Sequence, residues 1–130
     1  MKIFKYRVAI FSKDPDRLAN FYINYLGFKL IIKIDSNDDY GYSLELSKGY
    51  KIWIARHSQI KSNNKDSFRI MLSLYVDNIS AFFNSIMKSK NIAIIEEPKT
   101  ACKGILGEER LVGSFLDPDG NCIQLMELIK

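Results

Sequence analysis

The sequence predicts an α+β fold in which two βαβββ modules form a curved mixed sheet with the helices on the outside. Two observations lead to this prediction: a capped amphipathic helix that occurs twice, and runs of alternating apolar residues that follow each copy in the same order. A length of 130 residues suits a single domain. We divide it into a first module at 1–56, a linker at 57–66 and a second module at 67–130.

The first predicted helix has both of its ends marked in the sequence between residues 14 and 27. Asp14 is the expected N-cap, and Pro15 stands at the first helical position, where its missing N–H costs nothing. Gly27 is expected to end the helix in the left-handed conformation. Between these ends, the helical spacing of one apolar stripe joins Leu18, Phe21, Tyr22, Tyr25 and Leu26.

A second copy of this pattern predicts another helix in the second half of the chain, with Asp77 as its cap. Laying Asp16 on Asp77 superimposes the two apolar stripes. The second stripe then consists of Ile79, Phe82, Phe83, Ile86 and Met87.

Alternating apolar and polar residues predict eight strands around these helices. In the first module the strands are expected at 3–11, 28–34, 40–47 and 50–55, and in the second at 68–76, 92–96, 110–116 and 122–129. Residues 98–107 are expected to form a loop and 117–121 a tight turn. Because only two helices are available to cover the strands, they are expected on one side, leaving a partly polar hollow on the other.

Composition excludes several classes of protein. Hydrophobic residues make up 47% and charged residues 26%, the balance of a globular domain. No apolar run is long enough for a membrane span, and the N-terminus lacks the features of a signal peptide, so we expect a cytoplasmic protein with no membrane contact. A charge of +4 without a dense basic stripe argues against nucleic-acid binding. Two cysteines are too few for a disulfide framework, and we expect Cys102 in a loop and Cys122 buried and inert.

Strand alternation predicts which side chains face the hollow. Arg7, Glu45, Met71 and Gln124 are expected there. Glu45 is the candidate catalytic residue, because a carboxylate on a central strand is costly unless it is paired. It either forms a structural ion pair with Arg7 or serves as a general base or a partner for a ligand amine.

Other candidates depend on the direction of their side chains. Arg69 either faces solvent or joins Arg7 in the hollow, where two guanidinium groups would suit a carboxylate or phosphate. Trp53 and Tyr75 would provide flat walls for a planar ligand if they point inward. His57 is expected to be an exposed linker residue, and it becomes a catalytic candidate only if the linker folds over the hollow.

Several motifs resemble those of the vicinal oxygen chelate superfamily, which includes glyoxalase I, bleomycin-resistance proteins and extradiol dioxygenases. The similarity rests on Phe21-Tyr22, Leu26-Gly27-Phe28, Asp117-Pro118-Asp119-Gly120-Asn121 and Ile123-Gln124-Leu125. The resemblance implies the glyoxalase/bleomycin-resistance fold and a homodimer. It also implies that Arg7, Glu45, Met71 and Gln124 occupy the positions that hold a divalent metal in metal-using members.

These residues do not form a classical metal site, because arginine stays protonated and methionine is a soft thioether. We therefore expect no metal and no other cofactor. The first functional hypothesis is a protein that binds a small organic molecule through Arg7, Glu45, Trp53, Arg69, Met71 and Gln124, for resistance or sequestration. The alternative is a metal-dependent lyase or isomerase of the glyoxalase I (lactoylglutathione lyase) type that uses Glu45 and Gln124. A protein-interaction module is a third hypothesis.

Overall fold

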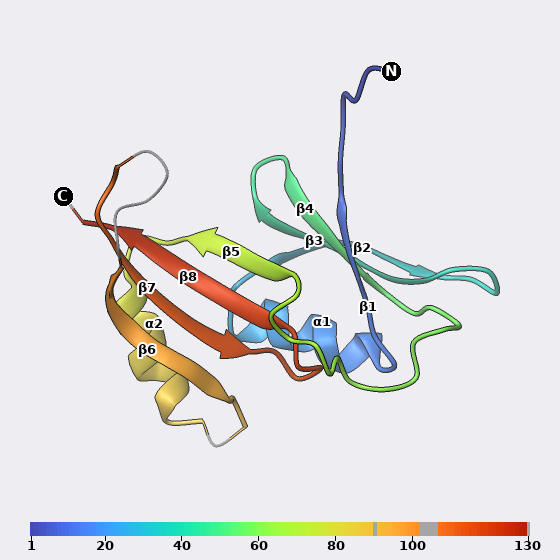
Figure 1. The fold of residues 1–130 in the computed structure, drawn as a ribbon. Coiled ribbons are helices and arrows are strands. Elements are labelled where there is room, and N and C mark those ends of the chain that lie inside the picture. The colour runs from blue at the N-terminus through green and yellow to red at the C-terminus, as the bar shows by residue number, and fades with distance from the viewer. Residues whose placement is uncertain (90, 102–106, 130) are drawn as a thin grey trace. The chain divides into compact units, whose positions relative to one another are not determined.

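The computed structural model describes residues 1–89, 91–101 and 107–129, and it divides into two compact units, Met1–Asn63 and Asn64–Lys130. Each unit contains one four-stranded mixed sheet and one helix, in the order strand, helix, strand, strand, strand (Figure 1). This order confirms the predicted α+β class and the βαβββ module. No helix in the described residues is long and apolar enough to cross a membrane.

The first unit has the strand order β1-β4-β3-β2. β1 runs parallel to β4, whereas β3 is antiparallel to both β4 and β2. The elements are β1 (Val8–Phe11), α1 (Pro15–Asn24), β2 (Lys29–Asp35), β3 (Tyr40–Ser47) and β4 (Tyr50–Ala55). β3 and β4 match the predicted ranges. The strand predicted at 3–11 is wrong over its first half, because the ladder with β4 begins with Val8 opposite Ile52. The residues before it extend away from the sheet (Figure 1).

The ends of α1 confirm the predicted caps. Oδ1 of Asp14 accepts a hydrogen bond from the backbone N–H of Arg17 at 3.2 Å. Gly27 has a φ of +71°, and its N–H donates to the carbonyl of Ile23 at 3.1 Å. The helix ends earlier than predicted, at Asn24, so Tyr25 is its C-cap and lies 44% exposed instead of continuing the buried stripe.

A polar cluster joins the first turn of α1 to β3. The hydroxyls of Tyr40 and Tyr42 each donate to Oδ1 of Asp16, both at 2.5 Å. The Nζ atom of Lys33 lies 5.2 Å from the ring centre of Tyr40 and 5.4 Å from that of Tyr42. The guanidinium carbon of Arg56 lies 4.4 Å from the ring centre of Tyr40. The hydrogen bonds from Tyr40 and Tyr42 lower the pKa of Asp16. Burial and the hydrogen bond to Asp16 raise the pKa of Tyr42.

Replacing Asp16 with asparagine is expected to lower the free energy of unfolding at neutral pH by roughly 1 kcal/mol, because this hydrogen-bonded carboxylate is exposed to solvent. The folded pKa lies below the unfolded value of about 3.9, so the stabilisation is present above that value and is lost as the pH falls through the folded one. Urea unfolding of wild type and variant across the acid range should show that the difference between their free energies of unfolding shrinks below about pH 4. The matched control Asp38→Asn replaces an exposed carboxylate and should be as stable as wild type at neutral pH.

The second unit has the strand order β5-β8-β7-β6, with β5 parallel to β8 and the other pairs antiparallel. Its elements are β5 (Met71–Tyr75), α2 (Ile79–Met87), β6 (Ile94–Ala101), β7 (Arg110–Leu116) and β8 (Cys122–Leu128). β7 has the predicted range. The first and last strands that the sequence predicts for this module, 68–76 and 122–129, are shorter in the structure than predicted.

The cap of α2 corrects the sequence prediction. The N-cap is Asn78, whose Oδ1 accepts from the N–H of Ala81 at 3.0 Å, and not Asp77. The carboxylate of Glu127 on β8 accepts from the N–H of Ile79 at 2.8 Å, which fixes the first turn at that residue. Aligning Asn78 with Asp14 superimposes three pairs of buried helix residues: Ile79 on Pro15, Phe83 on Ala19 and Ile86 on Tyr22.

The predicted loop at 98–107 is wrong at its beginning, because β6 continues through Pro98 to Ala101. β6 is the edge strand of its sheet, and the register with β7 shifts on both sides of Glu96. Proline is tolerated at such positions because its missing N–H removes no ladder bond. Cys102 and the rest of the predicted loop up to Leu106 lie outside the described residues.

Each unit has its own core between the helix and one face of the sheet. In the second unit, the rings of Phe82 and Phe83 on α2 lie 5.4 Å and 6.0 Å from the ring of Phe115 on β7. A Cβ atom on Gly113 would lie 2.7 Å from Cζ of Phe83, so this strand position has to be a glycine for the helix to approach. The core of the first unit includes Leu18, Phe21, Tyr22, Phe28, Leu44, Ile52 and Ile54.

The turn between β7 and β8 confirms the predicted tight turn. The carboxylate of Asp117 accepts from the N–H groups of Asp119 and Asn121, both at 2.9 Å, and from Nδ2 of Asn121 at 2.9 Å. Gly120 has a φ of +85° and donates its N–H to the carbonyl of Asp117 at 3.0 Å. The turn therefore uses the carboxylate for structure, as expected of a turn and not of a calcium loop.

Candidate functional site

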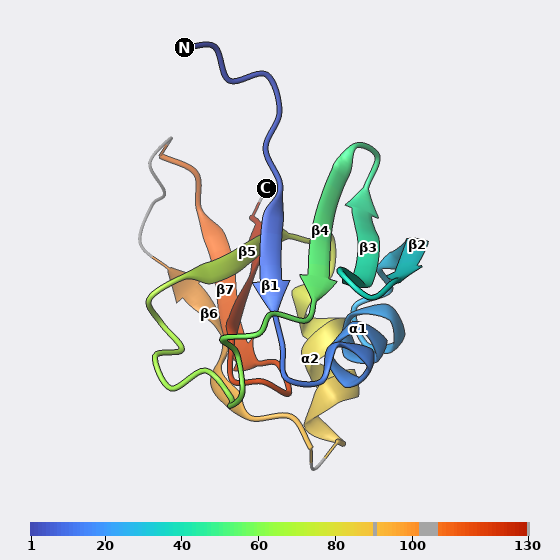
Figure 2. The same cartoon turned by 90° about the vertical axis from the view of Figure 1, so that its right-hand side faces the viewer.

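The first sheet has one face covered by its helix and one face without a helix. α1 packs on β3 and β4 (Figure 2), and the bonds from Tyr40 and Tyr42 to Asp16 identify the covered side. Alternation then places Gly41, Ser43 and Glu45 on the other side, which we call the helix-free face. The strand register adds the remaining members: Ala9, Phe11, Lys29, Ile32, Ile34, Lys51, Trp53 and Ala55.

Trp53 lies on this helix-free face, directly opposite Ser43 on β3 and Ala9 on β1. The guanidinium carbon of Arg7 lies 5.4 Å from the centre of its indole ring, in a cation–π contact. Trp53 is buried, with 5% of its surface exposed. A Cβ atom on Gly41 would lie 2.8 Å from Cζ2 of Trp53, so the glycine provides the space that the indole occupies.

Glu45 lies half-buried on β3, in register with Lys29 on β2 and Lys51 on β4. The expected ion pair with Arg7 is not formed: within 1–89, 91–101 and 107–129, no ion pair joins Arg7 to Glu45. The contact with Trp53 explains the difference, because it holds the guanidinium over the indole. Glu45 therefore shares its face with cationic neighbours but has no fixed salt bridge.

In the second unit, Met71, Ser73 and Tyr75 share the face of β5 that lies in register with Cys122, Gln124 and Met126 on β8. The hydroxyl of Ser73 donates to Oε1 of Gln124 at 3.2 Å, which orients the amide. Tyr75 is 61% exposed. Cys122 is buried, and burial raises the pKa of its thiol, with Asp117 as a smaller cause. The expectation of a buried Cys122 is thus confirmed.

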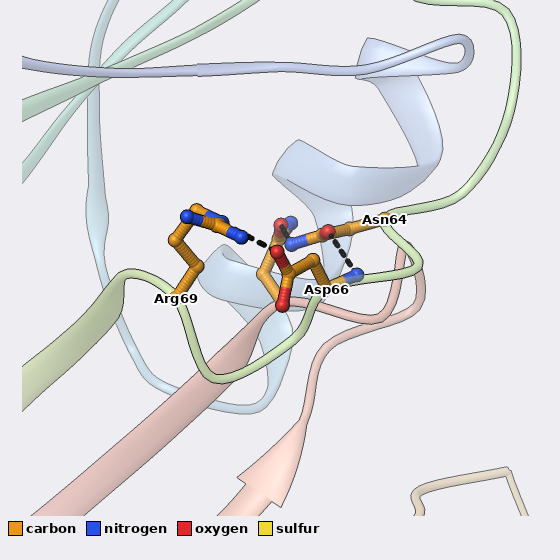
Figure 3. Close-up of polar contacts among 4 residues, drawn as sticks. Asn64, Asp66 and Arg69 are labelled. Carbon is orange, nitrogen blue, oxygen red and sulfur yellow. Dashed lines mark hydrogen bonds and ion pairs between the residues drawn. The ribbon is translucent and has the colours of Figure 1, made fainter.

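Arg69 lies before β5 and does not continue its alternating face (Figure 3). Its Nε donates to the carboxylate of Asp66 in an ion pair. The N–H of Asp66 in turn donates to Oδ1 of Asn64 at 2.8 Å, and Nδ2 of Asn64 donates to Oδ1 of Asn121 at 3.0 Å. The guanidinium of Arg69 is therefore paired with the segment that leads into β5.

His57 is exposed, as expected of a linker residue, but it contacts the end of the helix-free face. Its ring centre lies 4.9 Å from that of Phe11, edge to face. Its Nδ1 accepts from the N–H of Gln59 at 3.1 Å, so a neutral imidazole carries its proton on Nε2. The sequence singled out neither Phe11 nor the two lysines beside Glu45, because only the register between strands brings them to the site.

The four positions that the resemblance implies for a metal carry one guanidinium, one carboxylate, one thioether and one amide. Glu45 is the one hard anionic donor among them, so this set does not fit a divalent ion. In the part of the chain that the structure describes, no three His, Cys, Asp or Glu side chains gather in a group that could hold a metal.

The family model "Glyoxalase/Bleomycin resistance protein/Dioxygenase superfamily" matches residues 6–125. Among solved structures, a glyoxalase I mutant from Zea mays is similar with a TM-score of 0.73 and 21% identity, over 92% of this chain but 43% of that chain. The chain thus spans less than half of the maize enzyme. TnmS3, an antibiotic binding protein from a Streptomyces species, gives a TM-score of 0.72 and 19% identity over 99% of both chains.

A third structure, from the mobile metagenome of V. Pseudocholerae, gives a TM-score of 0.72 and 23% identity over 100% of this chain and 98% of that one. At these identities the similarities show the fold. No curated protein gives a significant sequence match.

Proposed function

The chain belongs to the Glyoxalase/Bleomycin resistance protein/Dioxygenase superfamily, and from this premise we propose that it binds a small organic molecule without a classical metal site, for resistance or sequestration. The observation that carries the proposal is the helix-free face of the first sheet. There Arg7, held beside the buried Trp53, and the half-buried Glu45 offer charged contacts on one face. An antibiotic binding protein is among the solved structures with this fold.

Glu45 is the proposed polar contact for the ligand. A half-buried carboxylate with no ion pair among the described residues is free to accept hydrogen bonds from a ligand hydroxyl or amine. In the second unit, Met71 and Gln124 lie on the corresponding strands, β5 and β8, and we propose ligand contacts for them as well. Arg69 is the least suited of the predicted binding residues, because its guanidinium is already paired with Asp66.

Replacing Glu45 with glutamine is expected to reduce ligand binding at least tenfold while leaving the fold intact, since the substitution removes a charge without changing the shape. A library of small organic compounds is screened by thermal shift on the wild-type protein. Each compound that stabilises it is then titrated against E45Q and against the control E97Q, a change on the exposed edge strand β6. Equal stabilisation of E45Q and wild type by every such compound would exclude Glu45 from the site.

A lyase or isomerase of the glyoxalase I type is the alternative, with Glu45 as the base and Gln124 as a further polar group. Its support is the placement of these two residues on the faces of β3 and β8 that lack a helix. Metal analysis of the purified protein separates the two functions. Stoichiometric nickel, zinc or manganese that is lost in E45Q would favour the enzyme. The homodimer and the cytoplasmic location remain predictions from the sequence.

A further inference from the structure

The helix-free face of the first sheet is divided into a charged row and an apolar region. Glu45 lies opposite Lys29 on one side and Lys51 on the other. Arg7 immediately precedes Val8, as Lys51 immediately precedes Ile52, and Val8 is the partner of Ile52. Lys51, Glu45 and Lys29 therefore form one row across β4, β3 and β2, and Arg7 lies at the end of this row, just before the first residue of β1.

This row carries an excess of positive charge that the protein does not neutralise. Arg7, Lys29 and Lys51 are exposed, and Glu45 is the single acidic member of the row. None of the three cations forms an ion pair with another of the described side chains. Unpaired cations that lie together attract anions, and arginine in particular matches the two oxygens of a carboxylate.

The residues beyond the charged row are apolar or small. The next row contains Ala9, Trp53, Ser43 and Ile32, and the row after it contains Phe11, Ala55, Gly41 and Ile34. The indole itself is buried, whereas Phe11, beside His57, is 38% exposed and Ile32 is 52% exposed. An exposed apolar region of this kind suits an aromatic ring system. Arg7 lies at the border, because its guanidinium is held over Trp53 at 5.4 Å.

We propose that this face binds an aromatic carboxylate, with the carboxylate on Arg7 and Lys51 and the ring system over Ala9, Ser43 and Phe11. The proposal rests on the proposed function and specifies the chemical class of the ligand. Trp53 acts as a positioning residue, since the cation–π contact holds the guanidinium of Arg7 beside its ring. Lys29, at the far end of the row, adds attraction at longer range.

Trp53 is the only tryptophan in the sequence, so its fluorescence reports on this face directly. The probes are naphthoate, the neutral naphthamide and the cationic naphthylmethylammonium, each titrated at low and high salt. We expect naphthoate to bind at least tenfold more tightly than naphthamide, and its advantage to shrink at high salt because exposed charges are screened. The cation should bind most weakly.

Two variants and one control test the role of Arg7. R7Q should reduce naphthoate affinity about tenfold and leave naphthamide affinity unchanged, and R7K should lose less because it keeps the charge. Lys13→Gln, at the other end of β1, should match wild type. If naphthamide or the cation binds this face as well as naphthoate does, or if R7Q weakens all three equally, the ligand class is wrong and the small-molecule function stands. If none of the three compounds perturbs the face, the ligand class is likewise wrong, and the library screen with E45Q decides the small-molecule function.

Discussion

Replacing Gly41 with alanine is expected to destabilise the protein by roughly 3 kcal/mol, the upper end of the usual cost of overpacking. The added Cβ would lie 2.6 Å from the carbonyl oxygen of Ile54, 2.7 Å from Cβ of Ala55 and 2.8 Å from Cζ2 of Trp53. The first two atoms are fixed by β4, so the indole has to move or the strands have to separate. Urea unfolding followed by circular dichroism measures the loss.

The same variant should also alter the fluorescence of Trp53 in the folded protein, because the indole loses its space against β3. Ser43→Ala is the matched control: it lies next in line on the same face of β3, opposite Trp53, and adds no volume. We expect S43A to stay within about 0.5 kcal/mol of wild type. A G41A protein as stable as wild type, with unchanged fluorescence, would show that Trp53 does not lie against Gly41.

Replacing Phe83 with alanine is expected to cost about 3–5 kcal/mol, the range for removing a buried aromatic ring from a core. Phe83 is 1% exposed, and its ring contacts that of Phe115 at a centre distance of 6.0 Å. Phe82, its neighbour on α2, is only partly buried, so Phe82→Ala should cost less. The measurement is urea unfolding of both variants. An F82A protein less stable than F83A would contradict the assigned core.

Gly113 provides a sharper test of the same packing. A Cβ there would lie 2.7 Å and 2.9 Å from Cζ and Cε2 of Phe83, so Gly113→Ala alone should be destabilising. In the F83A background those ring atoms are gone, and the methyl group can fill part of the space. The double variant should therefore be more stable than the sum of the two single losses predicts. Simple additivity would mean that the two residues do not touch.

The sequence predicted β3, β4 and β7 closely, because each combines strict alternation with a clear turn on at least one side: Lys48-Gly49 between β3 and β4, and Asp117 to Asn121 after β7. It failed where the local signal is ambiguous. Asp77 and Asn78 are equally good caps, and the choice follows from Glu127, which lies far away in sequence and binds the N–H of Ile79. Pro98 looked like a strand breaker, but only in the sheet does it become clear that β6 is an edge.

For the candidate site, alternation allowed a prediction of which face of its strand each residue lies on, but not of which residues lie beside it. Alternation alone placed Arg7 and Glu45 on one face of the first sheet; in the structure Glu45 shares a face with Trp53, whose ring Arg7 contacts. It could not place Lys29 and Lys51 beside Glu45, since cross-strand register depends on turns and bulges. Two such shifts occur in this sheet, between Leu30 and Ile32 and between Glu45 and Ser47. The Arg7–Glu45 ion pair, one of the two readings of Glu45, is not formed among the described residues, because Arg7 contacts Trp53 instead.

The most direct test of ligand binding on the helix-free face is an NMR titration of the isotope-labelled protein with naphthoate. We predict that the amide signals that shift belong to Arg7, to the strands β1, β3 and β4, and to the indole N–H of Trp53, and that R7Q abolishes the effect at the same naphthoate concentration. Shifts confined to the Asp16–Tyr40–Tyr42 cluster on the covered side, or the absence of any shift on β1 and β4, would contradict it.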